Sequence, residues 1–202
     1  LLSMKGSSKI LSVLIYGLST ALGIIALSYP FFFPAAVENT PMGLARMGEM
    51  PLMLTVLLGL CLVVLLYEAQ GQAFNTKMIA LLGVLVAINA ALRFIEVAIP
   101  GPGGFSPIFF LIILTGYIYG GKFGFLMGSL TIFVSALVTG GVGPWLPSQM
   151  FAAGWAGMSA PLCRPVVHWL RSENKRGEVV ILAVLGVLWG FLYGFIMNLW
   201  SW

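Results

Sequence analysis

Acidic and titratable side chains are scarce in this sequence of 202 residues. It has no aspartate and only one histidine and two cysteines, and charged residues make up 8% of the chain, against about 25% in ordinary soluble domains. No span holds paired carboxylates, and there is no GxSxG motif or phosphate-binding loop, so we find no catalytic residues and do not expect an enzyme. His168, Cys61 and Cys163 lack the spacing of a metal site, so no metal or cofactor is predicted.

Apolar residues are abundant instead, at 60% of the chain. Runs of roughly 17 to 25 mostly uncharged residues cross a bilayer as helices. Candidates lie near 10–33, 51–67, 78–98, 107–121, 123–139, 149–168 and 179–202. These runs do not alternate apolar and polar residues as the strands of a membrane barrel do. We therefore predict an all-α, polytopic membrane bundle of about seven transmembrane helices.

The basic residues indicate the orientation of these helices. With the N-terminus in the cytoplasm, most of them fall on the cytoplasmic side, namely Lys5, Lys9, Lys77, Lys122, Arg164, Arg171, Lys175 and Arg176. Only Arg46 and Arg93 fall on the other side. This bias fits the positive-inside rule. We expect a multi-pass protein of the inner (plasma) membrane of a bacterium, with the loops at 34–50, 99–106 and 140–148 outside.

A polar joint, EAQGQAFNTK at 68–77, divides the chain. We predict an accessory N-terminal helix pair over residues 1–76 and a functional membrane core over residues 77–202. The sequence given starts Leu-Leu and stops at NLWSW, inside an apolar run. We expect from this that a further C-terminal helix belongs to the core, although an interfacial tryptophan pair is also a plausible terminus.

The polar residues of the segment VAINAALRFIEVAIPG stand out, because charges inside a span are costly and usually face a cavity or a partner. Asn89, Arg93 and Glu96 are spaced by four and three residues, which places them on roughly one helix face toward the outer side. One interpretation is an internal Arg93–Glu96 ion pair, or extension of both side chains to the interface. The other is a pocket that opens to the outside.

Two uncharged loops rich in glycine and proline converge on the same outer region. IPGPGGFSP at 99–107 carries Phe105, and TGGVGPWLPSQM at 139–150 carries Trp145 and Gln149. Proline stiffens such loops and glycine permits unusual backbone conformations, which suits a compact lid. Two tight extracellular turns are the simpler alternative.

Small residues recur at intervals of four. Gly83, Ala87 and Ala91 form one such stripe, and Ala153, Gly157 and Pro161 form a second. Stripes of this kind allow two helices to approach closely. Packing within the chain is the default explanation, and a docking face for another subunit is the alternative for the first stripe.

From about residue 78 onward, the chain resembles the substrate-binding S component of an energy-coupling factor (ECF) vitamin transporter. The resemblance rests on AINAALRFIE, the outer loop with GGFSP, the helix pair joined through YGGKFGF, and GGVGPWLPSQMFAAGWAG. It covers roughly the last 125 residues of the chain. The core has five predicted spans where the family has six, and the two N-terminal spans are additional.

The resemblance implies a subunit that binds a vitamin or related micronutrient near the outer face, beneath the loops at 99–107 and 140–148. It also implies that Ala87 and Ala91, with Gly83, dock onto a transmembrane coupling T component driven by two cytoplasmic ATPases. No nucleotide site and no nucleic acid partner are then expected on this chain, which has the lipid bilayer as its solvent.

For the substrate, aromatic faces and a few amide or charged groups are what a buried polar vitamin needs. The residues expected to supply them are Asn89, Arg93, Glu96, Phe105, Trp145, Gln149, Trp155 and Asn198. We expect a cobalamin-like or other ring-containing micronutrient. The alternative function is a non-catalytic structural or assembly subunit of a larger membrane complex. A self-sufficient secondary transporter would need coupling-ion groups or an inverted repeat, and we find neither in the sequence.

Overall fold

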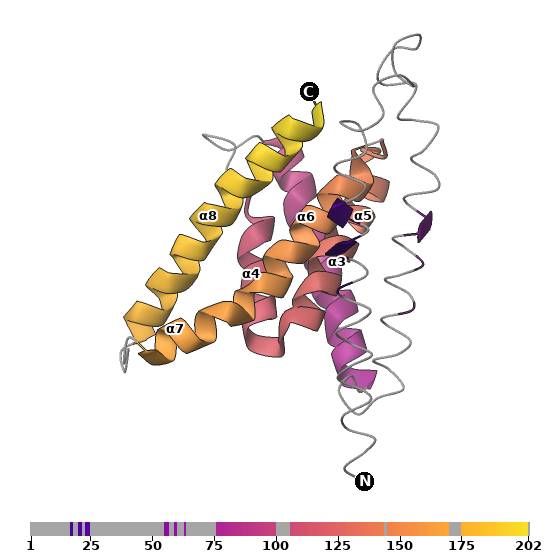
Figure 1. The fold of residues 1–202 in the computed structure, drawn as a ribbon. Helices are drawn as coiled ribbons and strands as arrows, with labels where there is room; N and C mark the ends of the chain where they lie inside the picture. Colours follow the sequence, from indigo (N-terminus) through magenta and orange to yellow (C-terminus); the bar gives the residue numbers. More distant parts are fainter. Residues whose placement is uncertain are drawn as a thin grey trace.

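The structure, a computed structural model, describes residues 76–99, 106–143, 145–169 and 175–201, together with isolated positions in the first 75 residues. The described part is helical throughout (Figure 1). Its elements are α3 (Thr76–Ala98), α4 (Ile108–Tyr119), α5 (Gly121–Thr139), α6 (Leu146–Ser159), the 3-10 helix η3 (Ala160–Leu162), α7 (Cys163–Trp169) and α8 (Lys175–Ser201). The all-α prediction is confirmed for these residues.

Three helices in this part are long and apolar enough to cross a membrane, over Thr76–Glu96, Gly121–Thr139 and Gly177–Asn198. The shorter α4 has 12 residues, a length of about 18 Å. The predicted segments at 10–33 and 51–67 lie outside the described residues except for single helical positions. The total number of spans and the membrane topology therefore stay predictions.

The segment predicted as one helix over 149–168 is interrupted in the structure. It starts three residues earlier, as α6, and passes through η3 before α7 begins at Cys163. Pro161 lies in this 3-10 turn. Proline has no N–H to donate into an α-helical ladder and its ring crowds the preceding turn, which accounts for the interruption.

Helix α5 is the centre of the bundle, because α3, α4 and α6 all pack against it. Its own core-facing residues are almost all buried, among them Phe123, Phe125 and Leu126. Helix α8 leans away from the others in Figure 1. It contacts α4, α6 and α7, and only 6% of its apolar stretch is buried.

Glycines bring α4, α5 and α6 into backbone contact. A Cβ atom added to Gly157 of α6 would lie 2.2 Å from the carbonyl oxygen of Gly124 in α5, and one added to Gly116 of α4 would meet the carbonyl of Gly157. A Cβ on Gly128 would meet the backbone of Ala153. We call this set of backbone contacts, made by Gly116, Gly124, Gly128, Ala153 and Gly157, the glycine seam. The predicted stripe at Ala153 and Gly157 therefore packs within the chain.

Two further glycines shape the ends of α5. Gly120 joins α4 to α5 with φ 102°, and Gly140 ends α5 with φ 68°. Only glycine adopts such positive angles without steric cost. The N–H of Gly140 donates to Ala136, as in a left-handed helix cap. This cap turns the chain toward α6.

Candidate functional site

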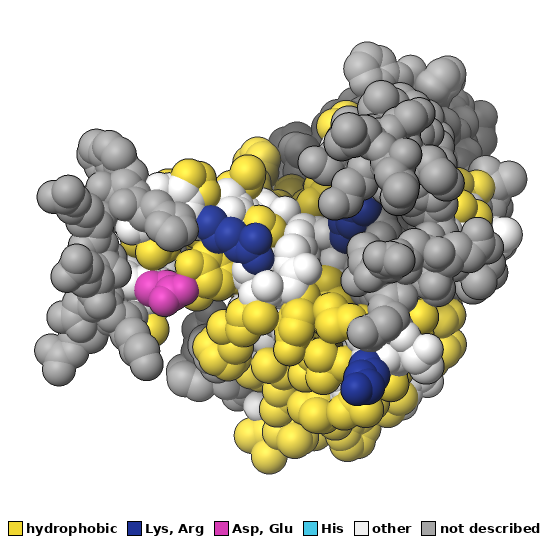
Figure 2. Space-filling model, turned by 90° about the horizontal axis from the view of Figure 1, so that it is seen from below, with side chains coloured by type: hydrophobic (Ala, Val, Ile, Leu, Met, Phe, Trp, Pro, Cys, Tyr) yellow, Lys and Arg dark blue, Asp and Glu magenta, His cyan; other side chains and the backbone are white. Residues whose placement is uncertain are grey.

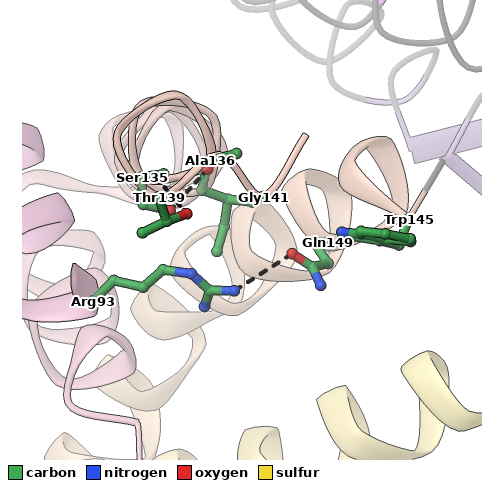
Figure 3. Close-up of a pocket in the computed structure, with 8 residues that line it drawn as sticks. Arg93, Ser135, Ala136, Thr139, Gly141, Trp145 and Gln149 are labelled. Atoms are coloured by element: carbon green, nitrogen blue, oxygen red, sulfur yellow. Dashed lines mark hydrogen bonds between the residues drawn. The ribbon is translucent and has the colours of Figure 1, made fainter. Parts of the chain in front are cut away.

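A cavity of about 200 Å³ lies between α3, α5 and α6, near the end of the bundle where α6 begins (Figure 3). Trp145, just before α6, and Gln149, in the first turn of α6, line one side of the cavity, and α3 contributes Arg93. The other lining residues are Ile132, Ser135, Ala136, Thr139 and Gly141. The lining combines one charged group, one amide, two hydroxyls and one large aromatic ring.

Arg93 and Gln149 point toward each other across this cavity in Figure 3. The guanidinium donates to the Gln149 side-chain oxygen at 3.5 Å, the long limit of a hydrogen bond. Both side chains are half-buried. Gln149 sits in the first turn of α6, which begins at Leu146, and Pro147 fits this turn because the first N–H groups of a helix have no partner within it.

The wall formed by α5 carries two hydroxyl groups. Ser135 donates to the carbonyl of Ile132 at 2.9 Å, and Thr139 donates to the carbonyl of Ser135 at 2.8 Å. These bonds satisfy the hydroxyl protons within the helix, and the oxygens keep lone pairs for an incoming donor. Trp145 is 42% exposed and lies at the edge of the cavity.

Glu96 takes part in a different contact from Arg93. Its carboxylate accepts a hydrogen bond from Ser106 at 2.7 Å, which joins the end of α3 to the start of α4. The side-chain hydrogen bonds given for Arg93 and Glu96 both go to neutral residues, Gln149 and Ser106. The interface and the pocket both remain interpretations of this pair.

The hydroxyl of Tyr193 on α8 lies beside both charged groups. It is buried, and both the Arg93 guanidinium and the Glu96 carboxylate interact with it electrostatically. Its ring packs edge-on against Phe109 of α4 with centroids 4.9 Å apart. The packing fixes the position of the hydroxyl.

Asn89 is fully buried one turn below Arg93. Its side-chain nitrogen donates to the Ile108 carbonyl at 3.2 Å and to the Thr131 hydroxyl at 3.3 Å. The residue therefore connects α3 to α4 and α5, and the described lining of the cavity does not include it. Its side-chain oxygen is buried without a partner.

The remaining predicted residues lie elsewhere. Trp155 is half-buried on α6, with its ring 5.8 Å from that of Phe151, and a Cβ on the buried Gly23 would touch both rings. It thus packs against a residue of the N-terminal part. Asn198 is exposed on α8, and Phe105 falls outside the described residues. The stripe of Gly83, Ala87 and Ala91 is exposed on α3.

Sequence reasoning missed three residues of this region, namely Ser135, Thr139 and Tyr193. Thr131, Ser135 and Thr139 recur every four residues on an otherwise apolar span, and this polar stripe was the available signal. Tyr193 gave no signal, because tyrosine is common near membrane interfaces.

The opposite end of the bundle differs in charge. Lys77, Lys122 and Arg164 lie in the first turns of α3, α5 and α7, and the view from below shows basic and acidic side chains standing out on an apolar surface (Figure 2). Arg164 donates to the carbonyls of Tyr117 and Ile118 at the end of α4. Within the described residues no group of three or more His, Cys, Asp or Glu is placed to hold a metal.

The family model for the substrate-specific component of the ECF transporter matches residues 77–202. The chain belongs to this family. A search of curated proteins and a search of solved structures found no match. As an S component, the chain is a multi-pass membrane protein and a non-catalytic binding subunit. The family implies a micronutrient substrate, a T component and ATPases that drive transport.

Proposed function

We propose that this S component captures a small ring-containing micronutrient from the outer face, in the cavity lined by Arg93, Trp145 and Gln149. The observation that carries the proposal is the convergence of these residues, from two segments of the family-matched core, on one cavity. Transport then depends on the T component and the ATPases.

The orientation follows from the distribution of charge. Lys77, Lys122 and Arg164 gather at the end opposite the cavity, and positive charge favours the cytoplasmic side. This supports a cavity that faces outward and, with two spans proposed before α3 in a bundle of about seven, a cytoplasmic N-terminus.

The loops at 99–107 and 140–148 are proposed to cover the bound ligand. Gly141 and Trp145 of the second loop already line the cavity. Ser106 of the first loop binds Glu96 close to the end of α3. A ligand beneath Trp145 would be shielded by a ring that is now 42% exposed.

The size of the cavity favours one of the two expected substrate types. Ligand pockets commonly measure about 300–1,000 Å³, and about 200 Å³ is available here. A cobalamin-like molecule needs far more space than this, so the dimensions support a single ring system with a short side chain.

For docking onto the T component, we propose the exposed stripe of Gly83, Ala87 and Ala91. Its neighbours Leu82, Val86 and Ala90 are buried against the bundle, so the stripe faces away from it. Small side chains there would let a helix of the T component approach closely.

The test is native mass spectrometry of the gently purified full chain, alone and with its T component and ATPases expressed together. We expect one small molecule at a one-to-one ratio and a complex with the T component. A chain that stays empty after exposure to a vitamin panel, yet holds other membrane proteins and no ATPase, would instead favour a structural or assembly subunit.

A further inference from the structure

We propose that the ligand of this cavity is an acid whose carboxylate pairs with Arg93 and whose ring carries an N–H or O–H group toward α5. This rests on the proposed function, because it names the class of substrate for the same cavity.

The first argument is the charge of the cavity. Arg93 is the only ionisable residue in the described lining, and its bond to Gln149 is a long one to a neutral amide. A guanidinium offers five N–H donors in a planar fork that matches a carboxylate. A charge within a membrane span is costly unless a partner or a cavity meets it, and an anionic ligand supplies that partner.

Neighbouring groups reinforce this preference. The first turn of α6 borders the cavity through Gln149, and the N-terminal end of a helix carries partial positive charge. Glu96 lies outside the described lining, and its carboxylate accepts a hydrogen bond from Ser106. The cavity therefore presents positive rather than negative charge to a ligand.

Tyr193 on α8 interacts with the same guanidinium. Its hydroxyl is buried and interacts electrostatically with both Arg93 and Glu96, and its ring is held against Phe109. Tyr193 lies outside the described lining, so it would act on a bound carboxylate through Arg93. We assign Tyr193 as a positioning residue for the Arg93 guanidinium on this basis.

The side chains of α5 determine which polar group the ring of the ligand should carry. The hydroxyls of Ser135 and Thr139 donate to backbone carbonyls of their own helix, so they meet a ligand as acceptors. A ring N–H or O–H group would satisfy them, and Trp145 offers a flat face next to it.

The experiment measures binding of matched acid and neutral probes to the full chain in lipid nanodiscs by isothermal titration calorimetry. The pairs are biotin with biotinamide and 4-aminobenzoate with 4-aminobenzamide, whose rings carry N–H groups. Nicotinate with nicotinamide is a pair whose ring lacks such a group, and thiamine is the cationic probe. We expect at least one acid to bind about 10- to 100-fold more tightly than its neutral partner, as for a charge-assisted hydrogen bond.

Variants separate charge from folding. Arg93→Gln should reduce the acid preference to less than about 3-fold, while Arg93→Lys should retain part of it because the charge stays. Tyr193→Phe should weaken the acid several-fold and leave the neutral partner unchanged. Arg164→Gln makes the same change at the opposite end and should leave the ratio as in the wild type.

Two failures are distinguishable. Binding of a neutral probe as tightly as its acid, or of thiamine in preference to the acids, overturns the acid proposal and leaves the capture function intact. A chain that binds no probe and carries no co-purified small molecule overturns both.

Discussion

Replacing Gly157 with alanine tests whether the glycine seam holds the S component together. The new Cβ would lie 2.2 Å from the carbonyl oxygen of Gly124 and 2.4 Å from its carbonyl carbon, whereas ordinary contact begins at 3.4 Å. Both atoms belong to the backbone and have no rotamer to change. Helices α5 and α6 would therefore have to separate by about 1 Å, losing dispersion contacts along their interface.

The magnitude follows from two opposing effects. Overpacking of this kind costs about 1–3 kcal/mol, and the better helix propensity of alanine returns up to about 1 kcal/mol. We expect a net loss of about 1–2 kcal/mol, which for a chain of this size lowers the melting temperature by about 2–8 °C.

Thermal unfolding in detergent, followed by intrinsic fluorescence, measures this loss. The matched control is Gly190→Ala on α8, where nothing lies within 4 Å of an added Cβ, and its melting temperature should stay unchanged or rise slightly. Equal melting temperatures for the two variants would refute the argument that backbone contact at Gly157 stabilises the bundle.

Two further substitutions test other parts of the fold. Asn89→Asp keeps the shape of a fully buried side chain but removes the amide that donates to the Ile108 carbonyl and the Thr131 hydroxyl. We expect a loss of about 1–3 kcal/mol, and a thermal melt like that of the wild type would contradict a stabilising role for these bonds. Ala91→Leu adds a large side chain to the exposed stripe on α3. We expect ligand binding to persist, and uptake to be lost in cells that also express the T component and ATPases. Normal uptake would show that the stripe is not the docking face.

The sequence predicted the long helices well and the interrupted one poorly. Helices α3, α5 and α8 start and end within a few residues of their apolar runs, because a run long enough to cross a bilayer leaves few alternatives to a helix. The segment 149–168 is less apolar than those runs, and it contains Arg164 and the two prolines Pro161 and Pro165, which its prediction as a single helix did not take into account. The break lies at Pro161 in a 3-10 turn, so the signal was the proline itself and not the mean hydropathy of the segment.

The candidate site was predictable in part, for a similar reason. Arg93, Trp145 and Gln149 were selected because charge, aromatic rings and amides are unusual in apolar surroundings, and they line one cavity. Asn89 was grouped with Arg93 by its spacing. It lies one helical turn deeper in the bundle, where its side chain donates hydrogen bonds to Ile108 and Thr131 on the neighbouring helices. Helical spacing gives the face on which a residue lies, and the depth of a cavity along that face depends on neighbouring helices.

The walls of the cavity are held by two different kinds of interaction. Helices α5 and α6 meet through glycine backbones, so any relative movement breaks many close contacts at once. Helix α3 has no such seam at Gly83, where nothing lies within 4 Å of an added Cβ, and its buried polar link is the pair of hydrogen bonds from Asn89. Because those bonds are near their length limit, a small shift of α3 costs less than a shift between α5 and α6. Adjustment to a bound ligand is therefore expected mainly on the wall that carries Arg93.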